Sequence, residues 1–445
     1  MFEFLKYIQP LFYYRLAFHS ANSDLLNNLV NQTELELADD NRYSSLDARF
    51  MDKAYRALQM GVIHQDKLSL GKSDKVQTIT HRNDNYLFVA KYFGKFKSIY
   101  VLFLRIICLN NPVLELLGFI KAFKIRKIDI TLNHCEYENF DTFKSQLIQS
   151  NPLVTVVIPT LNRYEYLKDV LKNLEAQDYQ NFELIICDQT ELISDDFYHG
   201  WNLNIQLIKQ EEKALWLARN RSIQVANGEI ILLTEDDVLL PKNWITNHLK
   251  CLDFFNCDIS AGVFFPEGKS IAKNHAYFKL ADHLATGNVC FRKSVFEKIG
   301  LFDRQFEKQR MGDGEFGLRA MLNGLKSVSN PFSYCIDVKA PTGGLRQMGS
   351  WDSLRPTKLF APRPVPSVLY LARKYFGNSA ARFYLIQNIP FSFIPYKFKK
   401  SKYLKLAFLF IVPLLIPVML VVVLKSWGKA SQMLNEGSKI AQLTV

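Results

Sequence analysis

The stretch VTVVIPTLNR, residues 154–163, places five strand-forming residues directly before a proline and a polar turn. Short β-branched runs of this kind are typical of buried strands in parallel sheets. Strands that alternate with helices predict βαβ units, and so an α/β domain with a mostly parallel sheet. Further strand runs, and helical patterns between them, lie at 164–174, 182–187, 205–208, 212–226 and 229–233.

The chain of 445 residues is too long for one ordinary domain, so additional folded parts are expected on both sides of this sheet. Residues 1–150 read as a mostly helical N-terminal domain whose role the sequence does not indicate. The α/β domain is expected over 151–345. The remaining parts are a basic segment at 346–403, a hydrophobic helix at 404–426 and a tail at 427–445.

The formal net charge of +12 indicates an anionic partner, which could be nucleic acid, a membrane surface or a phosphate-bearing substrate. Much of the excess lies near the C-terminus, which favours a membrane and argues against nucleic acid. The seven cysteines show no CxxC or zinc spacing, so we expect reduced thiols, and the first residues do not resemble a secretory signal. The C-terminal lysines are Lys397, Lys399, Lys400, Lys402 and Lys405.

Two apolar segments raise the question of membrane contact. Residues 406–424 carry no charge and are long enough to span a bilayer, although Pro413 and Pro417 weaken the pattern. An interfacial or a buried helix remains an alternative. The lysines before this segment predict that the protein is associated with a membrane, the inner membrane if the source is bacterial. They also predict that the α/β domain lies in the cytoplasm. Residues 98–123 are broken into pieces too short to span, and membrane contact there is left open.

Polar residues follow the ends of three predicted strands. They are Thr160 to Arg163, then Asp188, and then the acidic run Glu235-Asp236-Asp237. Single residues of these types usually cap helices or close turns. Three adjacent carboxylates repel one another unless a cation neutralises them, and oxygen ligands at a sheet edge suit Mg²⁺ or Mn²⁺ shared with phosphates.

Taken in order, the motifs VVIPTLNR (156–163), ICD (186–188), ARNR (218–221) and LTEDD (233–237) resemble the inverting family 2 glycosyltransferases of GT-A fold. The resemblance covers roughly residues 152–330. It implies a nucleotide-sugar donor and a divalent metal, Mn²⁺ or Mg²⁺. A glycan or glycolipid acceptor and a role in polysaccharide biosynthesis are expected as well.

The resemblance also assigns roles by position. Residues of the first turn would line the nucleotide pocket, Asp188 would hold the base, and Arg219 would lie near the diphosphate. Asp237 is the implied metal ligand, with Glu235 beside it in place of the usual aspartate. Gln189 stands where a second aspartate is common. The residues expected to bind the donor are Pro159, Thr160, Asn162, Arg163, Asp188, Arg219 and Asp236.

A second group of motifs lies further along, at 286–293 and 311–319. Asp313 and Glu315 fall at the start of a predicted helix, where the dipole alone favours acidic residues. In the resembled family this segment carries the general base. That role falls here on Asp313, with Glu315 as the second candidate, because Gly312 replaces the first acid of the pair.

The expected reaction is therefore a metal-assisted, inverting single displacement of a sugar from its nucleotide onto an acceptor hydroxyl. The alternatives are a sugar nucleotidyltransferase, which should have a Gly-rich loop after the first strand, and a processive synthase. A catalytically inactive protein that binds sugar nucleotides or glycans is a third. His283 is expected to be structural, and residues 341–346 either close over the donor or form an ordinary connection.

Overall fold

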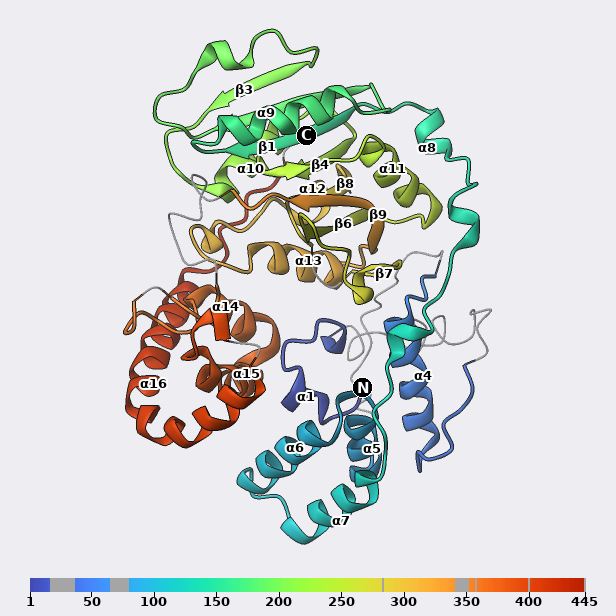
Figure 1. The fold of residues 1–445 in the computed structure, drawn as a ribbon, viewed down its shortest axis with the longest axis vertical. Coiled ribbons are helices and arrows are strands. Elements are labelled where there is room, and N and C mark those ends of the chain that lie inside the picture. The colour runs from blue at the N-terminus through green and yellow to red at the C-terminus, as the bar shows by residue number, and fades with distance from the viewer. Residues whose placement is uncertain are drawn as a thin grey trace. The chain divides into compact units, whose positions relative to one another are not determined.

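The computed structural model forms two compact units (Figure 1). One, the helical unit, holds the described parts of residues 1–64, 69–135 and 354–428. The other, the sheet unit, holds those of 136–353 and 429–445. The structure describes residues 1–16, 37–64, 80–281, 284–340, 352–356, 358–398 and 401–443.

The sheet unit is built on one nine-stranded sheet in the order β3-β2-β1-β4-β8-β6-β9-β5, with β7 paired to β9. The first four strands in this order are parallel, and β8 runs antiparallel to both its neighbours. The predicted α/β fold is confirmed. The strands are β1 Val154–Thr160, β2 Phe182–Asp188, β3 Ile205–Lys209, β4 Ile230–Thr234, β5 Val238–Leu239, β6 Ile259–Pro266, β7 Lys279–Leu280, β8 Asn288–Arg292 and β9 Ser327–Asp337.

Burial explains the composition of the central strands. Every residue of β1 and of β4 is buried, as expected for strands covered on both faces. Parallel pairing aligns Thr160 at the end of β1 with Asp188 at the end of β2. The polar residues that follow these strands therefore emerge along one edge of the sheet.

Helices cover this sheet. Helix α10 packs on β1 and β2, α11 packs on β6, β8 and β9, and α13 contacts β9. The apolar stripe predicted for α9 is buried at Leu167, Leu171 and Leu174. The helices of this unit are α8 Gln146–Gln149, α9 Tyr164–Glu175, α10 Leu215–Gln224, α11 Trp244–Phe254, α12 Ser294–Ile299 and α13 Gly312–Leu322, with short 3₁₀ turns η2 Glu138–Phe140, η3 Asp195–Tyr198, η4 Lys273–His275 and η5 Arg304–Phe306.

The helical unit contains the helices of the N-terminal part together with those that follow residue 354. Aromatic rings fill its core. Phe2 is stacked on Phe88 with 4.1 Å between the ring centres, and Phe4 is edge-on to Tyr86 with 4.9 Å between the ring centres. Its elements are α1 Leu5–Ile8, α4 Leu46–Met60, α5 Arg82–Phe93, α6 Lys95–Ile107, α7 Pro112–Phe123, η1 Ile130–Leu132, α14 Pro366–Leu371, the π-helical turn η7 Ala372–Phe376, α15 Gly377–Ser392, η8 Tyr396–Phe398 and the main part of α16 Lys402–Glu436.

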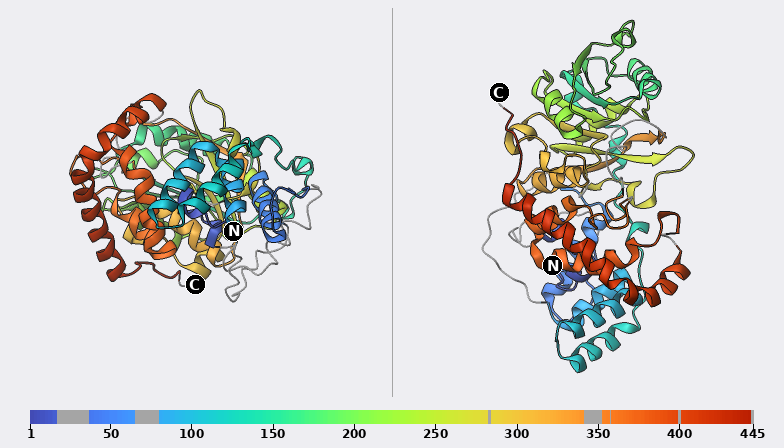
Figure 2. Two further views of the ribbon diagram at one scale, coloured as in Figure 1. Left: turned by 90° about the horizontal axis from the view of Figure 1, so that it is seen from below. Right: turned by 90° about the vertical axis from the view of Figure 1, so that its left-hand side faces the viewer.

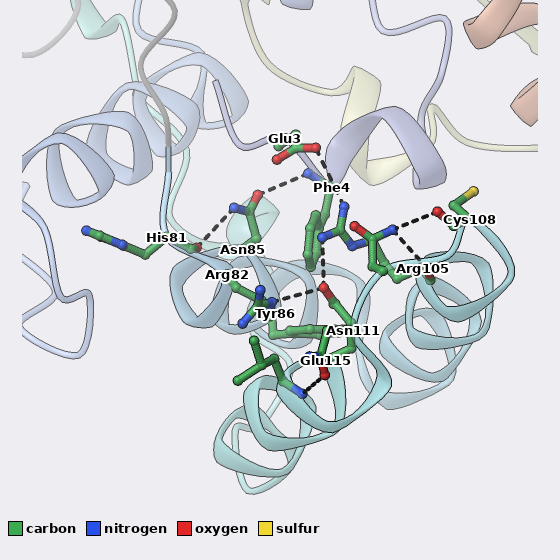
Figure 3. A network of polar contacts seen from close by, with 12 residues as sticks. Glu3, Phe4, His81, Arg82, Asn85, Tyr86, Arg105, Cys108, Asn111 and Glu115 are labelled. Atoms are coloured by element: carbon green, nitrogen blue, oxygen red, sulfur yellow. Dashed lines mark hydrogen bonds and ion pairs between the residues drawn. The ribbon is translucent and has the colours of Figure 1, made fainter.

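A buried polar network holds α5, α6 and α7 together (Figure 3). Glu115 of α7 has no exposed surface and accepts hydrogen bonds from Arg105 at 2.7 Å, Arg82 at 2.9 Å and Tyr86 at 2.9 Å. Burial alone would raise the pKa of the Glu115 carboxyl. The hydrogen bonds from Arg105 and Tyr86 outweigh it and hold the pKa below its ordinary value.

The apolar C-terminal segment forms α16, which curves past α14 and α15 (Figure 1). Its portion Phe410–Glu436 has a mean hydropathy of 2.3 in its most apolar window and is the one described helix with the length and composition to cross a membrane. The chain then continues as an extended tail that packs on the sheet unit (Figure 2).

Replacing Glu115 by glutamine should destabilise the helical unit by about 2–4 kcal/mol, because Arg82 and Arg105 lose their shared carboxylate. Because the pKa of Glu115 is lower in the folded protein, its ionised form contributes to stability at pH values above the pKa of an unfolded glutamate, which is about 4. This stabilisation is lost as the pH falls through the folded-state pKa. Denaturant unfolding at pH 7 and pH 3.5 tests both parts. The control is Glu3→Gln, whose half-exposed side chain lies 3.7 Å from Arg105 and should cost no more than about 0.5 kcal/mol.

Candidate functional site

Two adjacent acids after β4 share one arginine from the turn after β1. Arg163 Nη1 donates to Asp236 at 2.9 Å and lies 3.0 Å from Asp237 Oδ2. Thr160 Oγ1 donates to the other oxygen of Asp236 at 2.8 Å. The acids and both partners are almost completely buried. The structure thus brings together four of the residues that the sequence analysis selected.

The crowding changes the proton affinity of this cluster. The pKa of Asp236 is raised to about 6, mainly because the carboxyl is buried; the positive charge of Arg163 opposes this shift and the negative charge of Asp237 adds to it. Asp237 Oδ2 is buried and accepts no hydrogen bond from the described residues, although Arg163 Nη1 lies 3.0 Å away. A buried carboxylate oxygen without a donor is costly unless a cation approaches it.

Asp188, at the end of β2, lies in a pocket of hydroxyl groups. It is fully buried, and its Oδ2 accepts from Tyr164 at 2.6 Å and Tyr198 at 2.8 Å. Its Oδ1 accepts the Thr190 amide at 2.9 Å. Burial and the Asp188 charge raise the pKa of both tyrosines, so both remain hydrogen-bond donors. The sequence analysis did not select these tyrosines: Tyr198 belongs to η3, which lies outside the helix and strand patterns, and Tyr164 was part of the helical pattern at 164–174.

The remaining residues of the first two turns mainly shape the backbone. Pro159 is buried within β1, beside Cys187 in register. Asn162 has a left-handed backbone with φ of 55°, which asparagine tolerates. Its backbone N–H donates to Thr190 Oγ1 at 2.9 Å. Gln189 Oε1 accepts the Ala214 amide at 2.7 Å, so this departure from the family pattern anchors the start of α10.

Arg219 of α10 is a buried cation with few partners. Its side chain is 1% exposed, and its Nη1 donates to Thr286 at 2.8 Å. Its Nη2 lies 4.0 Å from Glu235, and neither Nη2 nor Nε makes a hydrogen bond to the described residues. Burial lowers the Arg219 pKa, which the charges of Glu235, Asp313 and Glu307 oppose. Two buried N–H donors without acceptors fit a site for an anionic ligand.

Small residues keep this region tightly packed. A Cβ on Gly287 would lie 2.6 Å from the Glu235 carboxyl carbon, and a Cβ on Gly312 would lie 2.4 Å from the Trp216 ring. Trp216 also lies against the Arg219 guanidinium, 5.2 Å from ring centre to carbon. Trp216 therefore contacts both Arg219 and the start of α13. Its ring leaves no room for a side chain at position 312, which explains the glycine there.

The two acids at the start of α13 differ sharply in their surroundings. Glu315 is fully buried and pairs with Arg319 at 3.1 Å, and Arg319 donates in turn to the carbonyls of Ile299 and Leu301. Asp313 is partly exposed, and the hydrogen bond it accepts comes from its neighbour Gly314 at 2.8 Å. Glu315 holds the loop before α13 in place, while the Asp313 carboxyl has no ion-pair partner of this kind among the described residues and is partly accessible.

Sequence reasoning missed three residues that complete the site. Thr286 holds Arg219, and Glu307 accepts the amides of Trp216 and Leu217, both at 3.2 Å, at the start of α10. Trp216 is fixed by a 3.1 Å bond from its indole N–H to the Phe306 carbonyl. These contacts join positions about 70 to 90 apart in the chain, so no local pattern marks them. His283 and the loop 341–346 lie outside the described residues.

The acidic cluster is compatible with a divalent cation. Among the described residues no group of three or more histidine, cysteine, aspartate or glutamate side chains forms a complete ligand set. Mg²⁺ and Mn²⁺ are commonly held by one or two carboxylates together with substrate phosphates and water. Asp237 Oδ2, which accepts no hydrogen bond from the described residues, and the partly exposed Glu235, with 41% of its side chain accessible, fit that mode.

The comparisons identify this part of the chain. A family model described as glycosyl transferase family 2 matches residues 155–314, which include the acidic cluster, Asp188, Arg219 and Asp313. Residues 155–314 belong to glycosyl transferase family 2. The predicted GT-A type of α/β domain is confirmed, and the resemblance seen in the sequence motifs is confirmed with it.

Relatives match the family 2 domain rather than the whole chain. Glycosyltransferase GlyA of Streptococcus pneumoniae serotype 4 is 23% identical over 163 residues, 36% of this chain and 22% of that protein. Glycosyltransferase GlyG of the same strain is 28% identical over 131 residues, 28% of this chain and 43% of that protein. The chain thus matches less than half the length of these two relatives.

One solved structure matches part of this chain. The fragment 1–349 of Staphylococcus aureus TarS, in complex with UDP-GlcNAc, is 17% identical with a TM-score of 0.41. The similarity covers 64% of this chain and 92% of that one.

Proposed function

We propose that this protein transfers a sugar from a nucleotide-sugar donor to an acceptor hydroxyl with inversion at the anomeric carbon. The observation that carries the proposal is the buried Arg219, which has two donor nitrogens without acceptors among the described residues and whose charge interacts with both Glu235 and Asp313. A donor diphosphate would accept from Arg219. The sugar would then lie between the acids after β4 and the carboxylate at the start of α13.

The donor nucleotide would lie along the edge where β1 and β2 end. Pro159, Thr160, Asn162 and Arg163 would form one wall, and Asp188 would accept hydrogen bonds from the base. The tyrosine hydroxyls that donate to Asp188 fix its carboxylate in place. The carboxylate would therefore not have to reorganise when the base binds. Asp236 would lie close to the donor ribose or sugar, held by Thr160 and Arg163.

A divalent metal, Mn²⁺ or Mg²⁺, would be held by Asp237, with Glu235 beside it. When bound it would stabilise the negative charge that gathers on the departing nucleoside diphosphate. Arg219 contributes a fixed positive charge to the same leaving group. Arg163 neutralises the paired aspartates and would keep Asp236 ionised at neutral pH despite its burial.

Asp313 is the general base of this proposal. An acceptor hydroxyl is a poor nucleophile until a positioned carboxylate takes its proton, which typically contributes about 10²–10⁴-fold in rate. Asp313 is the accessible acid of α13, whereas Glu315 is occupied by Arg319. A single displacement needs no covalent intermediate, so these groups suffice.

The protein is further proposed to act at a membrane, with the family 2 domain on the cytoplasmic side and an envelope glycan or lipid-linked saccharide as acceptor. The apolar, partly exposed α16 and the excess of basic residues support this location. The test of the transfer itself is a panel of UDP-, GDP-, dTDP- and CMP-sugars with Mn²⁺, Mg²⁺ or EDTA. A nucleotidyltransferase would instead consume a nucleoside triphosphate and release pyrophosphate, and an inactive binding protein would bind a donor without turnover.

Asp237→Asn should weaken metal-dependent donor binding by about 10²-fold or more while the fold is kept, because the side chain keeps its shape and loses its charge. Isothermal titration with donor in Mn²⁺ and in EDTA measures this. Asp169→Asn, at a half-exposed surface position of the same domain, is the matched control and should bind normally. Wild-type affinity in Asp237→Asn would remove the metal from the proposal.

Asp313→Asn should reduce turnover by about 10²–10⁴-fold and leave donor affinity within about twofold, because the base acts only on the acceptor. Steady-state rates and donor titration separate the two effects. The control is Glu297→Gln on the surface of α12, which should keep full turnover. Unchanged turnover in Asp313→Asn would exclude it as the base.

Donor binding should depend on pH through Asp236. Its raised pKa means that the carboxyl takes up a proton as pH falls through about 6 rather than about 4. The ionised form is the one that pairs with Arg163 and faces the donor, so donor affinity should decrease in that range and be full above it. Titrations from pH 3.5 to 8 check this, and Asp236→Asn should abolish the step at 6. A step near 4 in wild type would contradict the assignment.

A further inference from the structure

Helices α6 and α7 expose an extensive apolar surface. Ordinary soluble helices bury their large apolar side chains and expose polar ones. Here the accessible fractions are 90% for Phe96, 61% for Phe103 and 95% for Leu109. The exposed large apolar residues of this hairpin are Phe96, Ile99, Phe103, Ile106, Ile107, Leu109, Val113, Leu114, Leu116, Leu117, Ile120 and Phe123.

The buried side of α7 explains why this surface points outward. It consists of Glu115, Gly118 and Ala122, so the helix buries its one acid and its small residues. Glu115 is fixed by Arg82 and Arg105 (Figure 3), and a Cβ on Gly118 would lie 2.9 Å from the Tyr86 ring. Rotating α7 to hide its leucines would break this network. The orientation is therefore specified by the sequence.

Basic residues gather at one end of the hairpin. Lys95 Nζ lies 4.4 Å from the centre of the Phe123 ring, which brings the first residue of α6 to the last residue of α7. The other end, residues 106–114, carries no charge, and Glu115 is the one acid between residues 85 and 128. The basic residues at the charged end are Lys95, Lys97, Lys121, Lys124, Arg126 and Lys127.

Helix α16 shows a second apolar surface in the same unit. Met419, Val422 and Ser426 are buried against the segment that leads into α14, with Arg363 N donating to the Val422 carbonyl at 3.1 Å and Ser426 to the Pro364 carbonyl at 2.6 Å. The opposite side is open: Phe410 is 82% and Leu414 79% exposed.

The tail after α16 is bonded to the domain that precedes it. Leu301 N donates to the Ala441 carbonyl at 2.8 Å, and Arg304 N donates to the Lys439 carbonyl at 3.1 Å. Gln305 Nε2 donates to the Gly437 carbonyl at 2.8 Å. Residues 437–441 thus lie on the same side of any membrane as the family 2 domain.

The contacts of the tail distinguish an α16 that spans the bilayer from one that lies at its surface. A chain that leaves the family 2 domain and returns to it must cross a bilayer an even number of times. Between residues 353 and 429, α16 is the one described helix with the length and composition to cross. A single crossing would separate the tail from its partners at 301–305, so α16 does not span.

We propose that the helical unit binds one leaflet of an anionic membrane, with the α6–α7 hairpin and the open side of α16 in contact with lipid and both ends of α16 on the catalytic side. Helices of 13 and 12 residues reach about 18–20 Å, too short for a bilayer core of about 30 Å. The six basic residues complement anionic headgroups, most abundant on the cytoplasmic leaflet. A second copy of this face would bring the same positive charges together.

Vesicle flotation of the full chain tests the surface. The protein should bind vesicles with 30% phosphatidylglycerol about tenfold or more tightly than pure phosphatidylcholine, with binding weakened by salt. Ile107→Glu with Leu109→Glu and Val113→Glu should lower vesicle binding at least tenfold. Leu192→Glu, 87% exposed on the sheet unit, is the matched control and should bind like wild type.

Lys121→Glu with Lys124→Glu should remove the preference for anionic lipid, whereas Lys269→Glu with Lys273→Glu on the sheet unit should not. Retained vesicle binding in the triple variant would overturn the proposal. So would a variant that loses self-association instead, since a second copy would then be the partner. No donor or acceptor is present, so these outcomes do not depend on the proposed sugar transfer.

The topology is tested by labelling single cysteines with a membrane-impermeant maleimide in sealed membrane vesicles of both orientations. In a Cys108→Ser, Cys135→Ser background, Glu191→Cys reports on the family 2 domain and Asn435→Cys on the end of α16, and both positions are exposed. The two should be labelled together in one orientation and protected together in the other. Opposite accessibility would show that α16 spans and would overturn this part of the proposal.

Discussion

Two carboxylates that neighbour each other in the chain, Asp236 and Asp237, are buried at the end of β4 and held by a single guanidinium. Without Arg163 the like charges would repel in a medium that screens them poorly. The ion pair ties the turn after β1 to the turn after β4, and the register of β1 with β2 brings Asp188 to the same edge. The position of each proposed donor-binding residue follows from this arrangement.

Arg219 adds a complementary constraint. It is as buried as the acids but keeps two donor nitrogens, Nε and Nη2, without acceptors among the described residues, so the site carries unsatisfied positive charge beside concentrated negative charge. A ligand that carries both phosphate and a divalent cation would satisfy both. Trp216 and Gly312 set the distance between this arginine and α13, because the ring fills the space that a side chain at 312 would need.

Much of the fold could be predicted because its signals are local. The β-branched run at β1 and the apolar stripe of α9 are patterns of adjacent or periodically spaced residues, and both are found where expected. The acids after β4 were recognised because parallel strands end at one edge. Tyr198, Thr286 and Trp216 could not be recognised, since their importance comes from contacts with residues distant in the chain or from a turn without a pattern.

The apolar segments show the same limit. Composition could not decide whether α6, α7 and α16 are core or membrane elements, because each outcome uses the same residues. The proposed arrangement at the membrane surface rests on the buried Glu115 and on the tail bonded to 301–305, and both are tertiary contacts. Likewise the spacing of Asp313 and Glu315 could not separate a base from a structural acid, whereas the ion pair of Glu315 with Arg319 favours Asp313 for the proposed role.

The most direct measurement is an experimental structure of the protein with Mn²⁺ and a non-hydrolysable nucleotide-sugar analogue. The account predicts the diphosphate within hydrogen-bonding distance of Arg219, the metal on Asp237, and the anomeric carbon facing Asp313. A donor bound away from the edge formed by β1, β2 and β4, or bound there with Arg219 still lacking an acceptor, would contradict it.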